Sequence, residues 1–293
     1  MKQFLFFIAI TILSNEIIFA QEDYQYLGVI KLNDSSMISY KISFMENNGI
    51  VRGYSVTDLS GEHETKSSII GTFDEDENNF EFKETDIVYT KSPILQKDFC
   101  FINFEGELKK INEKYQIKGR FKGLYNDGSE CISGEIRVAS LSRILKQAKK
   151  LDKKIDRNPF VKKEDKARID VERTIDSLNI NVIDKNENLN IFTDDQRITL
   201  IIYDMGKEDG DKINLDIAGE RILTSYEITK DRKQLIVDLE NPATIIKLKA
   251  LNEGAIAPNT VRLQIVDSNN QIKTLTNLKA GEEASITILK REE

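Results

Sequence analysis

The sequence predicts a mostly β protein: an N-terminal antiparallel meander or up-and-down barrel, two linking helices and a C-terminal Ig-like β-sandwich. Apolar and polar residues alternate with period two in two long regions, which is typical of strands with one buried face. Between these regions the apolar spacing becomes helical. We therefore divide the chain into a signal peptide at 1–20, a barrel-like domain at 21–140, a helical linker at 141–190 and a sandwich domain at 191–293.

The first twenty residues have the pattern of an export signal. Lys2 supplies a positive start, residues 4–13 form a short apolar core, and the small residue Ala20 precedes Gln21. An apolar run of this length is too short to cross a hydrocarbon core of roughly 30 Å. We therefore expect cleavage rather than anchoring, and a periplasmic or extracellular location.

The N-terminal region reads as a series of short strands. Residues 38–44, 115–121 and 132–138 alternate strictly, and turn sequences such as Asn47-Asn48-Gly49 separate such runs. We count about eight strands, and closing them into a barrel would remove exposed edges. The region resembles a small lipocalin-like barrel in strand count and turn spacing. Its many phenylalanines would either line a ligand cavity or fill a core, and core filling is the simpler interpretation.

Two helices are expected in the linker. The first begins at Leu141 and stops before Asn158-Pro159, and the second runs from about Lys163. Both have basic polar faces in a chain whose formal net charge is −7. These faces would contact an anionic surface, such as lipid headgroups, or they are solvated or docked on the acidic domains of the protein itself. The overall negative charge speaks against nucleic acid as a partner.

The chain has two cysteines, Cys100 and Cys131. In an exported protein a lone pair most simply forms a disulfide. A zinc site is not expected, because two cysteines and the single His63 cannot supply the usual four ligands.

The C-terminal region again alternates, for example over 213–217, 235–239 and 261–265, and its spacing predicts about seven or eight strands. It also resembles a β-sandwich module that recurs in secreted proteins of Gram-negative bacteria. The matching residues are Asp204, Gly206, Asp209, Gly210 and Asp211, followed by Ala250 to Gly254 and Pro258 to Thr260. The resemblance implies an extracytoplasmic accessory or binding module and brings no catalytic residues with it.

Two sites are candidates in this region. The carboxylates of Asp204, Glu208, Asp209 and Asp211 are hard oxygen ligands that calcium accepts, although their spacing is not that of an EF-hand. The alternative is a turn in which the aspartates bind loop amides. Asn252 and Asn259 could contact a ligand such as a sugar from an exposed loop, or cap backbone groups of that loop.

Signals of catalysis are weak. The chain has one histidine and contains no Gly-x-Ser-x-Gly elbow, P-loop or His-Glu-x-x-His sequence. We assign no catalytic residue and no cofactor besides the calcium candidate. Three hypotheses follow: an exported binding or scaffold protein whose partner is an unknown envelope protein, glycan or lipid; a lipocalin-like carrier of a small apolar ligand; and a glycan-active enzyme.

Overall fold

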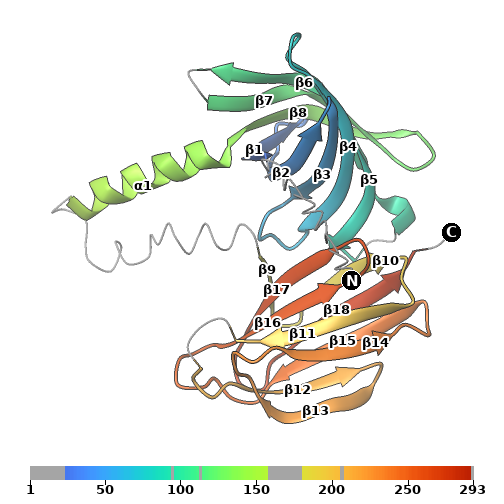
Figure 1. Ribbon diagram of the computed structural model, residues 1–293, viewed down its shortest axis with the longest axis vertical. Coiled ribbons are helices and arrows are strands. Elements are labelled where there is room, and N and C mark those ends of the chain that lie inside the picture. Colours follow the sequence, from blue (N-terminus) through green and yellow to red (C-terminus); the bar gives the residue numbers. More distant parts are fainter. Residues whose placement is uncertain (1–23, 94–95, 112–113, 158–179, 205–207, 292–293) are drawn as a thin grey trace, which may run out of the picture.

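The computed structural model describes residues 24–93, 96–111, 114–157, 180–204 and 208–291, and Figure 1 shows their arrangement. The prediction of a mostly β protein is confirmed: eighteen strands, one α-helix and one short 3-10 helix (Gln96–Asp98) occupy these residues. The predicted signal peptide lies outside the described residues.

The N-terminal part is an eight-stranded antiparallel barrel. Each strand pairs with its neighbours in the sequence, β5 with β6 included, and β8 pairs back with β1. This is the up-and-down order that the meander predicted. The strands are β1 (Tyr24–Leu32), β2 (Met37–Asn47), β3 (Ile50–Thr57), β4 (Thr65–Asp74), β5 (Asn79–Thr90), β6 (Phe101–Ile111), β7 (Lys114–Leu124) and β8 (Glu130–Ser140).

Aromatic rings fill the inside of the barrel. Phe44 and Phe80 stack with ring centroids 5.0 Å apart, and Phe82 stacks on Phe104 at the same distance. Gly71 leaves room for this packing, because a Cβ at that position would lie within 2.8 Å of the Phe82 Cβ. These contacts are those expected of a filled core.

Helix α1 (Leu141–Arg157) follows β8 and projects from the barrel (Figure 1). The elements that it mainly contacts are β1 and β8. The described residues thus contain one α-helix, not the two that the helical spacing predicted. The second helix, predicted from about Lys163, lies outside the described residues.

The C-terminal part consists of two five-stranded sets that share one apolar core, with Leu189, Ile213 and Ile286 from one set packing with Leu200 and Leu263 from the other. Two of its pairings, β10 with β18 and β9 with β17, are parallel. The strands are β9 (Asn181–Asp184), β10 (Asn188–Thr193), β11 (Arg197–Tyr203), β12 (Lys212–Ile217), β13 (Glu220–Glu227), β14 (Lys233–Asp238), β15 (Ala243–Ala250), β16 (Asn259–Val266), β17 (Gln271–Leu278) and β18 (Glu283–Lys290). Because β9 begins at Asn181 and β10 spans the boundary expected between 190 and 191, strands occupy the end of the region predicted as helical linker.

The two parts are joined by more than a linker. Strand β10 pairs with the end of β5, so that one thirteen-stranded sheet runs from the barrel into the C-terminal part. Val88 and Tyr89 of β5 belong to the C-terminal core cluster. The sequence predicted two β domains joined by a helical linker and did not reveal this shared sheet.

Candidate functional site

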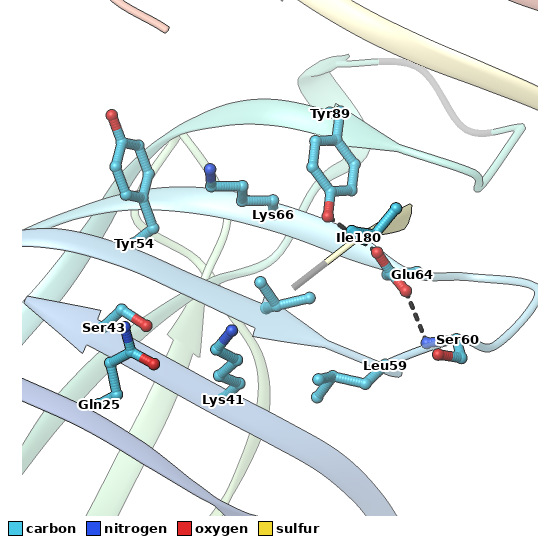
Figure 2. A pocket seen from close by; sticks show the side chains of 11 residues that line it. Gln25, Lys41, Ser43, Tyr54, Leu59, Ser60, Glu64, Lys66, Tyr89 and Ile180 are labelled. Atoms are coloured by element: carbon cyan, nitrogen blue, oxygen red, sulfur yellow. Dashed lines mark hydrogen bonds between the residues drawn. The ribbon is translucent and has the colours of Figure 1, made fainter. Parts of the chain in front are cut away.

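A partly enclosed cavity of about 220 Å³ lies on the outer wall of the barrel, beside the start of the C-terminal part (Figure 2). We call it the lysine cavity, because two lysine side chains point into it. Its lining residues are Gln25, Lys41, Ser43, Tyr54, Val56, Leu59, Ser60, Glu64, Lys66, Tyr89 and Ile180.

Strand alternation places the lysines. Tyr40 and Ile42 on β2 belong to the interior core of the barrel, so Lys41 between them points outward into the cavity. Lys66 comes from the neighbouring part of β4. A lysine at an outward position on a strand is usually solvated. Here Lys41 is only 8% exposed.

The electrostatic environment of these lysines is unusual. Burial, together with the positive charge of Lys41, lowers the pKa of Lys66 to about 8. Burial also lowers the pKa of Lys41, and the negative charge of Glu64 partly opposes that shift. The Lys66 ammonium lies 4.0 Å from the centroid of the Tyr54 ring, a cation–π contact, and forms no ion pair with the described residues.

Among the described residues, Glu64 is the one acidic residue that lines the cavity, and its carboxylate accepts three hydrogen bonds. The donors are the Tyr89 hydroxyl at 2.8 Å, the Asn181 amide at 2.7 Å and the Ser60 backbone N–H at 2.6 Å. Figure 2 shows Glu64 turned toward Tyr89 and Ser60. Three neutral donors thus stabilise the Glu64 carboxylate at the edge of the cavity that Lys41 and Lys66 line.

Residues of the C-terminal part complete the site. Ile180 lines the cavity directly, and the Tyr54 hydroxyl donates to Asn270 Oδ1 at 3.3 Å in the turn after β16. Nearby, Lys91 Nζ binds the carbonyl of Val182 at 2.5 Å and Glu187 at 2.9 Å. The cavity therefore depends on how the barrel and the C-terminal sheets meet.

The predicted metal ligands mostly bind backbone groups. Glu208 Oε1 accepts the Lys230 N–H at 2.6 Å, Asp209 Oδ2 accepts the Ile256 N–H at 2.9 Å, and Asp211 Oδ2 accepts the Thr260 N–H at 2.9 Å. Asp204 lies at the end of β11 and is 9% exposed. The Asp209 and Asp211 contacts tie the segment before β12 to the segment that leads into β16, and the Glu208 contact ties it to the loop between β13 and β14.

One carboxylate oxygen of this acidic cluster accepts no hydrogen bond from the described residues. Asp211 Oδ1 is buried without a hydrogen-bond partner among the described residues. Burial raises the pKa of Asp211 to about 6, and the charges of Asp209, Asp204 and Glu253 add to that effect while the Thr260 N–H opposes it. No group of three or more histidine, cysteine or acidic side chains in the described part of the chain is arranged to hold a metal ion. Calcium binding by Asp204, Glu208, Asp209 and Asp211 stays a prediction, and identical melting curves in calcium and in chelator would exclude it.

Asn252 and Asn259 form hydrogen bonds to backbone groups of the same loops. Asn252 accepts the Lys212 N–H at 2.6 Å and donates to the Gly210 carbonyl at 2.7 Å. Asn259 is fully buried and donates to the carbonyls of Lys212 and Asn252. This is the arrangement expected of the capping alternative, and contact of either side chain with a ligand stays a prediction.

The predicted disulfide is confirmed. Cys100 and Cys131 are bonded with Cα atoms 6.1 Å apart and join the residue before β6 to β8. His63 lies in an exposed turn, as its sequence context indicated. In the described part of the chain, no helix is both long and apolar enough to span a membrane.

A second, larger hollow lies on the outer face of the barrel and is open to solvent. It carries charges of both signs, among them Arg52, Glu81, Glu105, Lys118 and Arg120. A surface with alternating charges does not select the charge of a ligand, whereas the lysine cavity favours an anion.

Comparisons with known proteins do not assign the chain. No family model matches it, and no curated protein is significantly similar to it. The function is therefore inferred from the geometry of the lysine cavity.

Proposed function

We propose that the protein is an exported, non-enzymatic binding protein of the bacterial cell envelope that holds a small anion in the lysine cavity. The observation that carries the proposal is that Lys41 and Lys66 line one partly enclosed cavity, in which the one acidic residue of the described lining, Glu64, is hydrogen-bonded to three other groups. An anion between the two amines would relieve their mutual repulsion and replace the water that burial removed.

The size of the cavity limits the ligand. Pockets for drug-sized molecules usually measure about 300–1,000 Å³, and this cavity measures about 220 Å³. The fitting class is therefore a carboxylate or phosphate with few heavy atoms. Ser43 and Ser60 lie on the lining and offer hydroxyl groups to such a ligand.

Export and envelope location are supported by separate features. The disulfide fits an oxidising compartment, and the leader pattern and the resemblance of the C-terminal region point the same way. We take the C-terminal part as an Ig-like sandwich in the broad sense, because two five-stranded sets share one core.

The packed rings inside the barrel do not favour the alternative of a carrier for an apolar ligand.

The proposal is tested by calorimetric titration of the chain that lacks residues 1–20. The probes are sulfate, succinate and inorganic phosphate, with glucose as the neutral control. We expect at least one anion to bind saturably and glucose not to bind. The variant Lys66→Gln should bind that anion about tenfold to a hundredfold more weakly, because it loses a charged contact worth about 1.5–3 kcal/mol.

Lys83→Gln is the matched control, since Lys83 is an exposed lysine on the outer face of β5. It should bind as the unchanged protein does, and circular dichroism should show that both variants stay folded. Equal affinity of the unchanged protein and Lys66→Gln, or no binding of any of the three anions, would overturn the proposal.

A further inference from the structure

Helix α1 concentrates positive charge in a chain that is acidic overall. Its basic residues outnumber its two aspartates, Asp152 and Asp156, whereas the formal net charge of the chain is −7. The basic residues are Arg143, Lys146, Lys149, Lys150, Lys153, Lys154 and Arg157. Such segregation of charge makes a local positive surface that the net charge of the protein conceals.

The lysines of this helix are not neutralised by the part of the protein that the structure describes. Lys146, Lys149, Lys150, Lys153 and Lys154 are exposed, and none of them forms an ion pair with any described residue. The helix projects from the barrel instead of lying along the acidic C-terminal part (Figure 1). Among the described residues, these lysines therefore do not dock on the acidic surface of their own chain.

The helix is also incompletely covered on its apolar side. Leu141 is buried against the barrel, but Ile144, Leu145 and Ala148 are only partly buried. A helix with lysines on one face and partly open aliphatic side chains on the other suits the boundary between water and a lipid bilayer.

We propose that α1 docks the protein on a bilayer surface that contains anionic phospholipid. The lysine ammonium groups pair with headgroup phosphates, and Ile144, Leu145 and Ala148 lie at the boundary of the headgroup layer. The acidic barrel and C-terminal part are repelled by the same surface, so among the described segments the helix is the one oriented toward it. This inference is independent of the anion in the lysine cavity.

The test is co-sedimentation of the chain that lacks residues 1–20 with vesicles. One set contains phosphatidylcholine alone, and the other contains phosphatidylcholine mixed with phosphatidylglycerol. We expect binding to the mixed vesicles at about 50 mM salt and loss of binding at about 500 mM salt, because surface charges are screened over a few ångströms at high ionic strength.

Two variants with the same net charge show whether vesicle binding depends on the lysines of α1 or on the charge of the whole protein. Lys→Gln at the four helix positions 149, 150, 153 and 154 should weaken partitioning about a hundredfold or more, since each lysine near an anionic surface contributes about a fivefold factor. Glutamine has nearly the helix propensity of lysine, so circular dichroism should be unchanged. Lys→Gln at the exposed positions 230, 233, 273 and 279, which also form no ion pair with described residues, should leave partitioning within about twofold of the unchanged protein.

Equal binding by the two variants would overturn the proposal, as would equal binding of the unchanged protein to neutral and anionic vesicles. Binding to polyglutamate without binding to the mixed vesicles would also overturn it, and would indicate an acidic protein as the partner. None of these outcomes bears on the calorimetric test of the lysine cavity.

Discussion

The Asn181 side-chain amide donates a 2.7 Å hydrogen bond to the Glu64 carboxylate and so ties the first C-terminal strand to the barrel. The two residues are 117 positions apart in the sequence, and both are buried. Glu64 also forms the edge of the lysine cavity. A contact that helps to join the two parts of the protein therefore also shapes the proposed binding site.

Asn181→Ala should lower the free energy of unfolding by about 1.5–3 kcal/mol, the usual contribution of a hydrogen bond to a charged group. The carboxylate keeps its bonds to Tyr89 and Ser60, so the protein should still fold. Urea denaturation followed by circular dichroism measures the change. Asn241→Ala, at an exposed position, is the control and should change the value by less than about 0.5 kcal/mol. A loss no larger than that of the control would mean that the Asn181–Glu64 contact does not hold the two parts together.

Anion binding in the lysine cavity should depend on pH. Lys66 has a pKa lowered to about 8, so it carries its charge at neutral pH and loses it as the pH rises through that value. The affinity for sulfate or succinate, which do not titrate in this range, should be steady near pH 7 and then fall by up to about tenfold for each further pH unit. Titrations from about pH 7 to about pH 9 measure this. Lys66→Gln should show a lower affinity and a flatter profile, and a profile as steep as that of the unchanged protein would assign the effect to another group.

Local patterns in the sequence were sufficient to predict much of the fold. The alternation around Tyr40 and Ile42 gave the correct inward face of β2, and Asn48-Gly49 does form a turn in which both residues have positive φ. The helix from Leu141 and the disulfide were also predicted. Each of these features depends on neighbours within a few residues or, for the disulfide, on the expected compartment.

The lysine cavity could not be predicted in the same way. Lys41 and Lys66 occupy outward positions on strands, where lysine is common and solvated. In the folded protein Lys41 is buried and Lys66 is half-buried in a cavity that Ile180 of the C-terminal part helps to line, beside the pairing of β10 with β5. That pairing involves Ile191 with Tyr89, about a hundred residues apart, and no periodicity within either strand encodes it. The strongest sequence signal, the aspartate-rich turn, instead marked loops whose carboxylates bind backbone groups.

The disulfide should contribute substantially to stability. Cys100 and Cys131 close a loop with a sequence separation of 31, and a loop of this length corresponds to about 3–4 kcal/mol in the chain-entropy model. The double variant Cys100→Ser, Cys131→Ser should lose about that much unfolding free energy in urea. Reductant should destabilise the unchanged protein to a similar extent and leave the double variant unaffected. Equal stability of the two proteins without reductant would show that strain or denatured-state structure cancels the effect of the cross-link.

Glu84 should make stability depend on pH from inside the barrel. Burial raises the pKa of its carboxyl to about 7, although the Ile102 N–H at 2.9 Å and the Ser55 hydroxyl at 2.5 Å both donate to it. Between the unfolded pKa of about 4.5 and the folded value, the native state keeps a proton that the unfolded state has released. The free energy of unfolding should therefore fall as the pH rises through this range, by up to roughly 3 kcal/mol.

Glu84→Gln should remove this loss, because glutamine stays neutral, can accept from Ile102 and can donate to the Ser55 oxygen. Denaturation from about pH 5 to about pH 8 should show the variant gaining stability over the unchanged protein as the pH rises. Asp211, whose pKa is raised to about 6, contributes equally to both proteins, so the difference between them isolates Glu84. Glu240→Gln, at an exposed position, should keep the slope of the unchanged protein. A constant difference between Glu84→Gln and the unchanged protein across this range would mean that Glu84 does not change its charge between about pH 5 and about pH 8 in the folded protein.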